Sequence, residues 1–249
     1  MDQLILSPNA YQRFLDGAET TVILLLISFV LGVALSVVVG VLRLSTNRLV
    51  RGAALVFVEL ARGISSVILI FLMAIALPIF LGVDQGNLIA LGALALGINM
   101  GGYGAEIIRG AILSVPKGQT EASIALNLSE YQRLRHVVLP QAMRVILPPM
   151  GNLTIEILKG TAIISTIGVA DLTYQISLIN TSQASASFTG DRVAYLMIAL
   201  NALVMYFILA QIIDFLFRMA ERYVEGRDEG RGGGSSPPDT GGAKAEATA

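Results

Sequence analysis

Five long apolar runs restrict this chain to a membrane fold more strongly than any other feature of its sequence. A helix needs about 20 residues to cross a hydrocarbon core of about 30 Å, and the runs reach that length. Backbone polar groups find no water in lipid, so such runs indicate helices rather than separate strands. We therefore predict an all-α integral membrane protein with five transmembrane helices. The predicted spans are residues 21–42, 55–82, 88–108, 145–169 and 193–217.

The fourth run is the least regular of the five. It contains Pro148 and Pro149 as well as the charged residues Glu156 and Lys159, so hydropathy alone could discard it. Without this span, however, the loops rich in arginine and lysine would fall on opposite sides of the membrane. Residues 145–169 are therefore kept as a span.

The composition excludes several other classes of protein. The chain is 54% hydrophobic and 14% charged, with a mean hydropathy of +0.71, whereas about a quarter of a soluble domain is charged. The formal net charge of −1, without a basic stripe, argues against a nucleic-acid partner. There is no cysteine and only one histidine, His136, so disulfides, thiolate metal sites and histidine clusters are excluded. We expect no metal and no cofactor.

Arginine and lysine are distributed unevenly between the predicted loops, and such residues are enriched on the cytoplasmic side. The loops after the first, third and fifth spans are rich in them, whereas Asp84 is the only charge between the second and third spans. This predicts an N-terminus outside, a C-terminus inside, and residues 171–192 outside. The basic residues are Arg43, Arg48, Arg51, Arg109, Lys117, Arg133, Arg135, Arg144, Arg218, Arg222, Arg227 and Arg231.

The two ends of the chain differ from its apolar body. Residues 1–19 contain Asp2, Asp16 and Glu19 rather than the basic region of a signal peptide, so we expect an extracytoplasmic segment and a first run retained in the mature protein. Residues 226–249 are rich in glycine, serine, proline and charge, and are expected to form a disordered cytoplasmic tail.

The loop after the third span carries a motif. It opens with Glu-Ala-Ser, reaches Val137 sixteen residues after the glutamate, and closes with Leu-Pro. This order resembles the cytoplasmic "EAA" loop of ABC-importer permeases, in which a Gly stands where Asn127 stands here. The resemblance implies that the loop forms a coupling helix that docks on an ATPase. The residues that correspond to the motif are Glu121, Ala122, Ser123, Asn127, Val137, Leu139 and Pro140.

The substitution of Asn127 for glycine has a local consequence. Glycine in such a loop permits a left-handed turn between two short helices, and asparagine is the residue next best suited to that conformation. We therefore predict a helix–turn–helix loop with a left-handed residue at position 127.

The resemblance extends from about residue 19 to residue 220. Residues 57–66, 102–122 and 139–168 are similar to the polar amino-acid uptake permeases, the histidine- and glutamine-type branch. Ile64 and Ser65 stand where Thr-Pro is usual, which indicates a subfamily with its own substrate. Importers of ectoine-like compatible solutes form one such branch. The implied solute is a polar amino acid or an amino-acid-like compatible solute.

The family resemblance also implies the architecture and the partners. Residues 20–225 would form a type I ABC-importer permease domain in the inner membrane of a bacterium. The implied partners are membrane lipid, an ATP-binding subunit dimer, a second permease, identical or paralogous, and an extracytoplasmic solute-binding protein. Gly-Lys never occurs in the sequence, so no phosphate-binding loop is possible and ATP hydrolysis is expected in another subunit. The chain is thus not expected to be an enzyme.

Three acid–base pairs at i, i+3 spacing are candidates for a gate or a translocation path, because charges in a membrane are costly unless paired or hydrated. Each pair can also neutralise itself within one helix, which we favour for the first two pairs, near the interfaces. For the third and deepest pair both interpretations stay open. The pairs are Glu59 with Arg62, Glu106 with Arg109, and Glu156 with Lys159.

Three asparagines in the spans, Asn99, Asn152 and Asn201, could line a polar path or join helices. A different class of function is an ion-coupled secondary carrier of small solutes. Such carriers usually have internal repeats with broken helices, which this sequence does not show. A receptor or a structural membrane protein is a further alternative, and a neighbouring gene for an ATPase or a solute-binding protein would discriminate among them.

Overall fold

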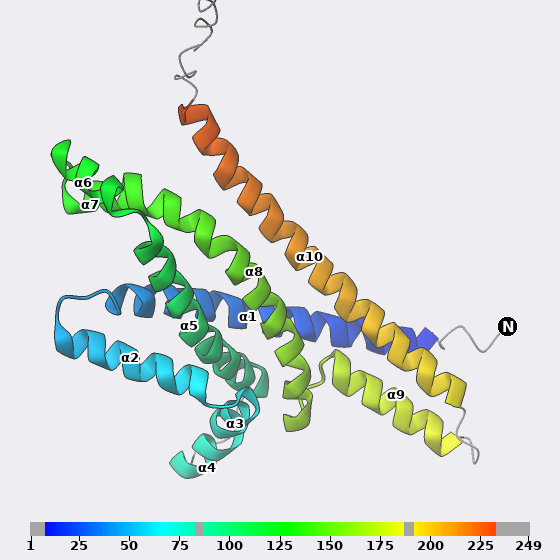
Figure 1. Ribbon diagram of the computed structural model, residues 1–249. Coiled ribbons are helices and arrows are strands. Elements are labelled where there is room, and N and C mark those ends of the chain that lie inside the picture. Colours follow the sequence, from blue (N-terminus) through cyan, green and yellow to red (C-terminus); the bar gives the residue numbers. More distant parts are fainter. Residues whose placement is uncertain (1–7, 83–86, 187–191, 233–249) are drawn as a thin grey trace, which may run out of the picture.

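A computed structural model describes residues 8–82, 87–186 and 192–232, and every regular element in these ranges is helical. The prediction of an all-α protein is therefore confirmed for this part of the chain. The elements are α1 (Pro8–Leu42), α2 (Arg48–Gly63), α3 (Ser66–Phe71), the π-helix η2 (Leu72–Ala76), α4 (Leu77–Leu81), α5 (Leu88–Ser114), α6 (Lys117–Ala125), α7 (Glu130–Arg133), the π-helix η3 (Leu134–Val138), α8 (Leu139–Ile164), the 3-10 helix η4 (Ser165–Ile167), α9 (Leu172–Ala186) and α10 (Arg192–Gly232) (Figure 1).

Among the described residues, three helices are long and apolar enough to cross a membrane alone: Tyr11–Leu42, Leu88–Ser114 and Ile198–Gly226. They correspond to the first, third and fifth predicted spans. Two bent pairs bring the number of spans to five if each pair is one span. One pair joins Arg48–Gly63 to Ser66–Leu81 at 104°, and the other joins Glu130–Ile167 to Leu172–Ile179 at 52°.

The second predicted span, residues 55–82, is not one straight helix. It is broken at Ile64 and Ser65, which are extended with ψ of 133° and 134°. Two extended residues in succession end the i→i+4 ladder, so α3 starts in a new direction. The prediction of a continuous helix here was wrong.

Side chains of α5 stabilise the end of α2 at this break. The amide Nδ2 of Asn99 donates to the carbonyl of Ala61 at 3.0 Å, and the hydroxyl of Tyr103 donates to the carbonyl of Arg62 at 3.4 Å. The last carbonyls of a helix have no partner within the helix, so these two bonds supply partners where α2 ends. Asn99 therefore joins helices, one of the two roles predicted for it.

Residues 145–164 of the fourth predicted span are helical and belong to α8, which continues through Pro148 and Pro149. Pro140 lies in the first turn of α8, where a missing N–H costs least. After Ile164 the chain passes through η4 and ends the helix at Gly168, whose φ of 89° is left-handed. The following helix, α9, therefore starts in a new direction.

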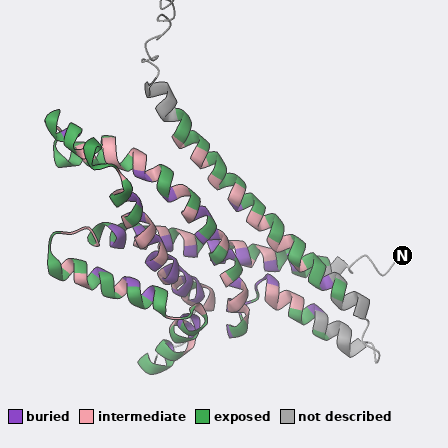
Figure 2. Cartoon of the chain, in the orientation of Figure 1, coloured by how far each residue is buried: buried purple, intermediate pink, exposed green. Residues whose placement is uncertain are grey.

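The core forms around α5, which packs against α1, α2 and α8 and is buried along most of its length (Figure 2). Its glycines allow α1 to approach closely. A Cβ at Gly104 would overlap Ser36 Oγ and lie 2.8 Å from Ser36 Cβ, and a Cβ at Gly101 would lie 2.7 Å from Leu35 Cβ. Small residues at such an interface allow helices to pack in lipid, where the hydrophobic effect does not drive them together.

Segments that are predicted to lie outside and the loop that is predicted to lie inside are at opposite ends of the molecule. The start of α1 and α9 lie together at one end, whereas α6 and α7 lie at the other (Figure 1). At the first end, the backbone N–H of Leu172 donates to Thr21 Oγ1 at 3.1 Å, which ties α9 to α1. Thr173 and Tyr206 share a hydroxyl hydrogen bond of 2.9 Å, which ties α9 to α10.

Several predictions concern residues at the ends of the described ranges. α10 continues to Gly232, so the boundary predicted at residue 226 falls inside a helix, and residues 233–249 of the predicted tail lie outside the described residues. Likewise α1 begins at Pro8, within the predicted N-terminal segment 1–19. Asp84 also lies outside the described residues.

Candidate functional site

The loop between α5 and α8, which we call the inner loop after the side on which it is predicted to lie, presents the first three motif residues on α6. Glu121 and Ala122 are exposed, whereas Ser123 is buried and donates its hydroxyl to the carbonyl of Thr120 at 2.6 Å. Ser123 thus faces the protein, while Glu121 is available to a partner.

Asn127 has a φ of 55°, so the predicted left-handed turn is confirmed. Its N–H donates to the carbonyl of Ile124 at 2.8 Å, and the N–H of Leu128 donates to the carbonyl of Ser123 at 3.1 Å. This pair of bonds is the Schellman motif, which ends a helix with a residue in the left-handed region, usually Gly and sometimes Asn. These two bonds therefore define the conformation of the turn between α6 and α7.

The second half of the loop begins with a capping box. Ser129 accepts from the N–H of Gln132 at 3.3 Å, and Gln132 accepts from the N–H of Ser129 at 2.9 Å. Beyond this turn, Val137 lies half-buried in η3, and Leu139 is exposed where α8 starts. The loop therefore consists of two capped helices that continue into α8.

Much of this loop, at one end of the molecule, is exposed (Figure 2). Several of its exposed side chains are large and apolar. Apolar side chains gathered on a polar, charged loop are typical of a surface that meets another protein. We call this group the inner-loop surface. Its members are Ile124, Leu126, Tyr131, Leu134 and Leu139.

Of the three predicted acid–base pairs, one forms within its helix. Arg109 Nη2 lies 2.8 Å from Glu106 Oε2. The structure adds a partner that the sequence does not predict: Arg43, just after α1, lies 3.0 Å from Glu106 Oε1. Glu106 therefore joins α1 to α5 and is neutralised by two guanidinium groups.

Neither of the other two predicted pairs is among the ion pairs of the described residues. The guanidinium carbon of Arg62 lies 5.1 Å from the centre of the Tyr103 ring, a cation–π contact. Glu59 is exposed on α2, and Glu156 and Lys159 are both exposed on α8. Neither pair therefore forms a direct ion pair within its helix among the described residues, and a role of these residues in a gate or a path stays a prediction.

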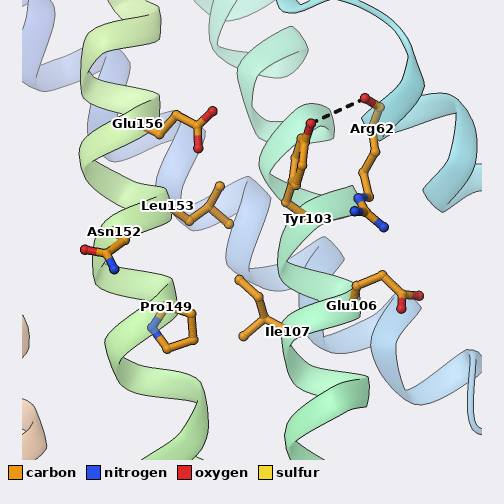
Figure 3. A pocket seen from close by; sticks show the side chains of 8 residues that line it. All are labelled: Arg62, Tyr103, Glu106, Ile107, Pro149, Asn152, Leu153 and Glu156. Carbon is orange, nitrogen blue, oxygen red and sulfur yellow. Dashed lines mark hydrogen bonds between the residues drawn. The ribbon is translucent and has the colours of Figure 1, made fainter.

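Glu156 and Lys159 line different cavities. Glu156 lines a cavity of about 460 Å³ between α2, α5 and α8, which we call the central pocket (Figure 3). Arg62 and Tyr103 lie across this pocket from Glu156 and Asn152 (Figure 3). Because Glu106, at its edge, is held by two arginines, Glu156 is the carboxylate of the pocket without an ion-pair partner among the described residues.

Lys159 lines a second cavity of about 420 Å³ between α8 and α10, which we call the α10 groove. Asp214 also lines this groove, but its carboxylate is paired with Arg218 at 2.7 Å. Of the two remaining asparagines, Asn152 lines the central pocket and Asn201 is exposed on α10.

A loop with a defined turn and a pocket lined by charged side chains between apolar helices are what a transport subunit requires. The family model of the binding-protein-dependent transport system inner membrane component matches residues 32–225. The chain belongs to this family. It is therefore a permease of the inner membrane, the membrane component of a binding-protein-dependent importer.

Curated relatives of this permease include transporters of amino acids. It is 37% identical to a probable amino-acid ABC transporter permease protein of Sinorhizobium fredii over 84% of this chain and 85% of that protein. It is 33% identical to the glutamine transport system permease protein GlnP of Escherichia coli, over 86% of this chain and 93% of that protein.

Solved structures share the permease fold. The crystal structure of an amino acid ABC transporter with histidines superposes with a TM-score of 0.73 at 30% identity, and covers 86% of this chain and 94% of that chain. The inward-facing MetNI methionine ABC transporter gives a TM-score of 0.67 at 20% identity, over 88% of this chain and 99% of that chain, which shows the common fold.

Proposed function

We propose that this permease forms part of the translocation path for a polar amino acid or an amino-acid-like compatible solute of the ectoine type, driven by ATP hydrolysis on a separate ATP-binding subunit dimer. The observation that supports it most is the central pocket, which presents a cation and a carboxylate on facing helices between the two ends of the molecule. A second permease, identical or paralogous, completes the membrane part, and an extracytoplasmic binding protein delivers the solute.

The chemistry of the central pocket fits a zwitterion. Arg62 can bind a carboxylate, and Glu156 can bind an ammonium or amidinium group. Asn152 and Tyr103 add an amide and a hydroxyl along the same walls. A volume of about 460 Å³ is in the range of cavities that bind small molecules. Amino acids and ectoine-like solutes both carry the two charges that this pocket would recognise.

The inner loop is proposed to transmit the work of the ATPase. Glu121 and Ala122 would seat α6 in a cleft on the ATP-binding subunit, with the inner-loop surface packed around them. Ser123 and Asn127 hold the shape of the loop, while Val137, Leu139 and Pro140 connect it to α8. Movement of the loop would then reach Glu156 along one continuous helix.

Arg62→Gln is expected to weaken solute capture. One hydrogen bond to a charged group contributes about 1.5–3 kcal/mol, so the KM for uptake should rise about ten- to a hundredfold. The measurement is uptake of radiolabelled glutamine, arginine and ectoine into proteoliposomes that contain the complete complex. Glu59→Gln is the matched control, because Glu59 lies one turn away on α2 and does not line the pocket. Equal KM values for both variants would contradict the proposed pocket.

The proposed orientation places the N-terminus outside and the C-terminus inside. Since the chain has no cysteine, single cysteines can report it without background. Ser177→Cys on α9 is expected to react with a membrane-impermeant thiol reagent in intact cells, because Ser177 is exposed at the outer end. Glu130→Cys on α7 should react only after permeabilisation. Labelling of position 130 in intact cells would overturn the orientation.

A further inference from the structure

One face of α8 is not covered by the other residues that the structure describes. Its exposed residues recur every three or four positions, so they lie above one another along the helix. We call this face the α8 stripe. Its members are Val145, Pro148, Asn152, Glu156 and Lys159.

The α8 stripe cannot face lipid without a large cost. Glu156 and Lys159 lie within the fourth predicted span, and neither has an ion-pair partner among the described residues. Unpaired charges at such a depth are costly, and they usually face water or another protein. Asp214, which lines the α10 groove beside Lys159, is already paired with Arg218. The stripe therefore requires an occupant that supplies charges of its own.

A second copy of this chain supplies those charges. Two copies with the same orientation in the membrane are related by a two-fold axis along the membrane normal, and in such a contact residue i meets residue j while j meets i. Their α8 helices then lie at the same depth. Glu156 and Lys159 are separated by three residues, or about 4.5 Å of helix rise. The flexible stem of a lysine spans that difference, so both charges are satisfied on both copies.

We propose that the α8 stripes of two copies face each other across the translocation path, with Glu156 of each copy paired to Lys159 of the other. This inference rests on the proposed function. Because Glu156 also lines the central pocket, a cationic group of the solute competes with the lysine of the second copy for it. The reciprocal pairs hold the path shut, and solute entry releases them.

Cross-linking tests the contact itself. One tagged copy carries Glu156→Cys and a differently tagged copy carries Lys159→Cys, so that a disulfide between them can form only across the interface. In the purified complex with its ATP-binding subunits, mild oxidation is expected to yield the mixed dimer. Glu59→Cys with Lys159→Cys is the control, and it should stay uncross-linked because Glu59 lies on α2. A mixed dimer no more abundant than in this control overturns the proposal.

Basal ATPase activity tests whether the reciprocal pairs of Glu156 and Lys159 act as a latch that holds the path shut. Lys159→Met and Glu156→Lys should each raise basal hydrolysis without solute by roughly fivefold or more, the range of a typical coupling between sites. The double exchange Glu156→Lys with Lys159→Glu recreates the reciprocal pairs and should restore low basal activity. Single variants at the wild-type level, or a double exchange no better than the singles, overturn the latch. Arg62→Gln tests the transport function separately, so failure of the latch with an intact effect at Arg62 leaves the proposed function standing.

Discussion

Replacing Glu121 with lysine is expected to abolish solute uptake while leaving the permease folded in the membrane. Glu121 is exposed on α6 and makes none of the ion pairs found among the described residues. Its charge therefore matters to a partner rather than to the core. The measurements are uptake into membrane vesicles and the amount of ATP-binding subunit that co-purifies with the permease. Both should fall to the background of a strain without the permease.

Two controls separate docking from general damage to the loop. Glu130→Lys makes the same charge change in the same loop. It should have a much smaller effect, because Glu130 is exposed and its ion pair with Arg133 is long, at 3.9 Å. Asn127→Gly should be tolerated, since glycine adopts a φ of 55° at no steric cost. If Glu121→Lys transports at the normal rate, the loop is only a connector.

Gly104→Val is expected to prevent stable folding. A Cβ at this position overlaps Ser36 Oγ, and Ser36 is itself held by donating to the carbonyl of Gly32 at 2.6 Å. Overpacking of this kind costs about 1–3 kcal/mol and sometimes more, which is a large part of a typical folding free energy. The yield of monodisperse protein in detergent and its melting temperature should both drop.

Gly110→Val is the matched control for this change. Gly110 lies on the same helix, and a Cβ there would meet nothing within 4 Å. The two substitutions share any cost of placing valine in α5, so the difference between them measures the contact between α1 and α5. Equal losses in both variants would show that this contact is not close.

The length of the apolar runs predicts α1, α5 and α10 because length is a local property of the sequence. The break between α2 and α3 is different. It depends on Asn99 and Tyr103, which are far along the chain and supply the hydrogen bonds that allow α2 to end at Gly63. No local pattern at Ile64 and Ser65 shows that such partners exist.

In the candidate site, too, some features depend on local sequence and others depend on partners far along the chain. The left-handed turn at Asn127 can be predicted, because it depends on the intrinsic conformational preference of one residue. Spacing along a helix predicts Glu106 with Arg109, but it cannot predict Arg43, which reaches Glu106 from another helix. For Arg62, the ring of Tyr103 competes with Glu59, and only the packing of α2 on α5 decides the outcome.

The close contact between α1 and α5 has a consequence for biosynthesis. Four other helical elements, α2, α3, η2 and α4, are synthesised between these two partners. The helix α1 therefore enters the bilayer before α5, on which it packs, has been synthesised. Until then the glycines of α1 make no stabilising contact with lipid. A nascent chain arrested before residue 88 would remain an unassembled set of helices, recognisable to membrane proteases. Release from the insertion machinery should then coincide with the emergence of α5, which would make that helix the checkpoint for quality control of this subunit.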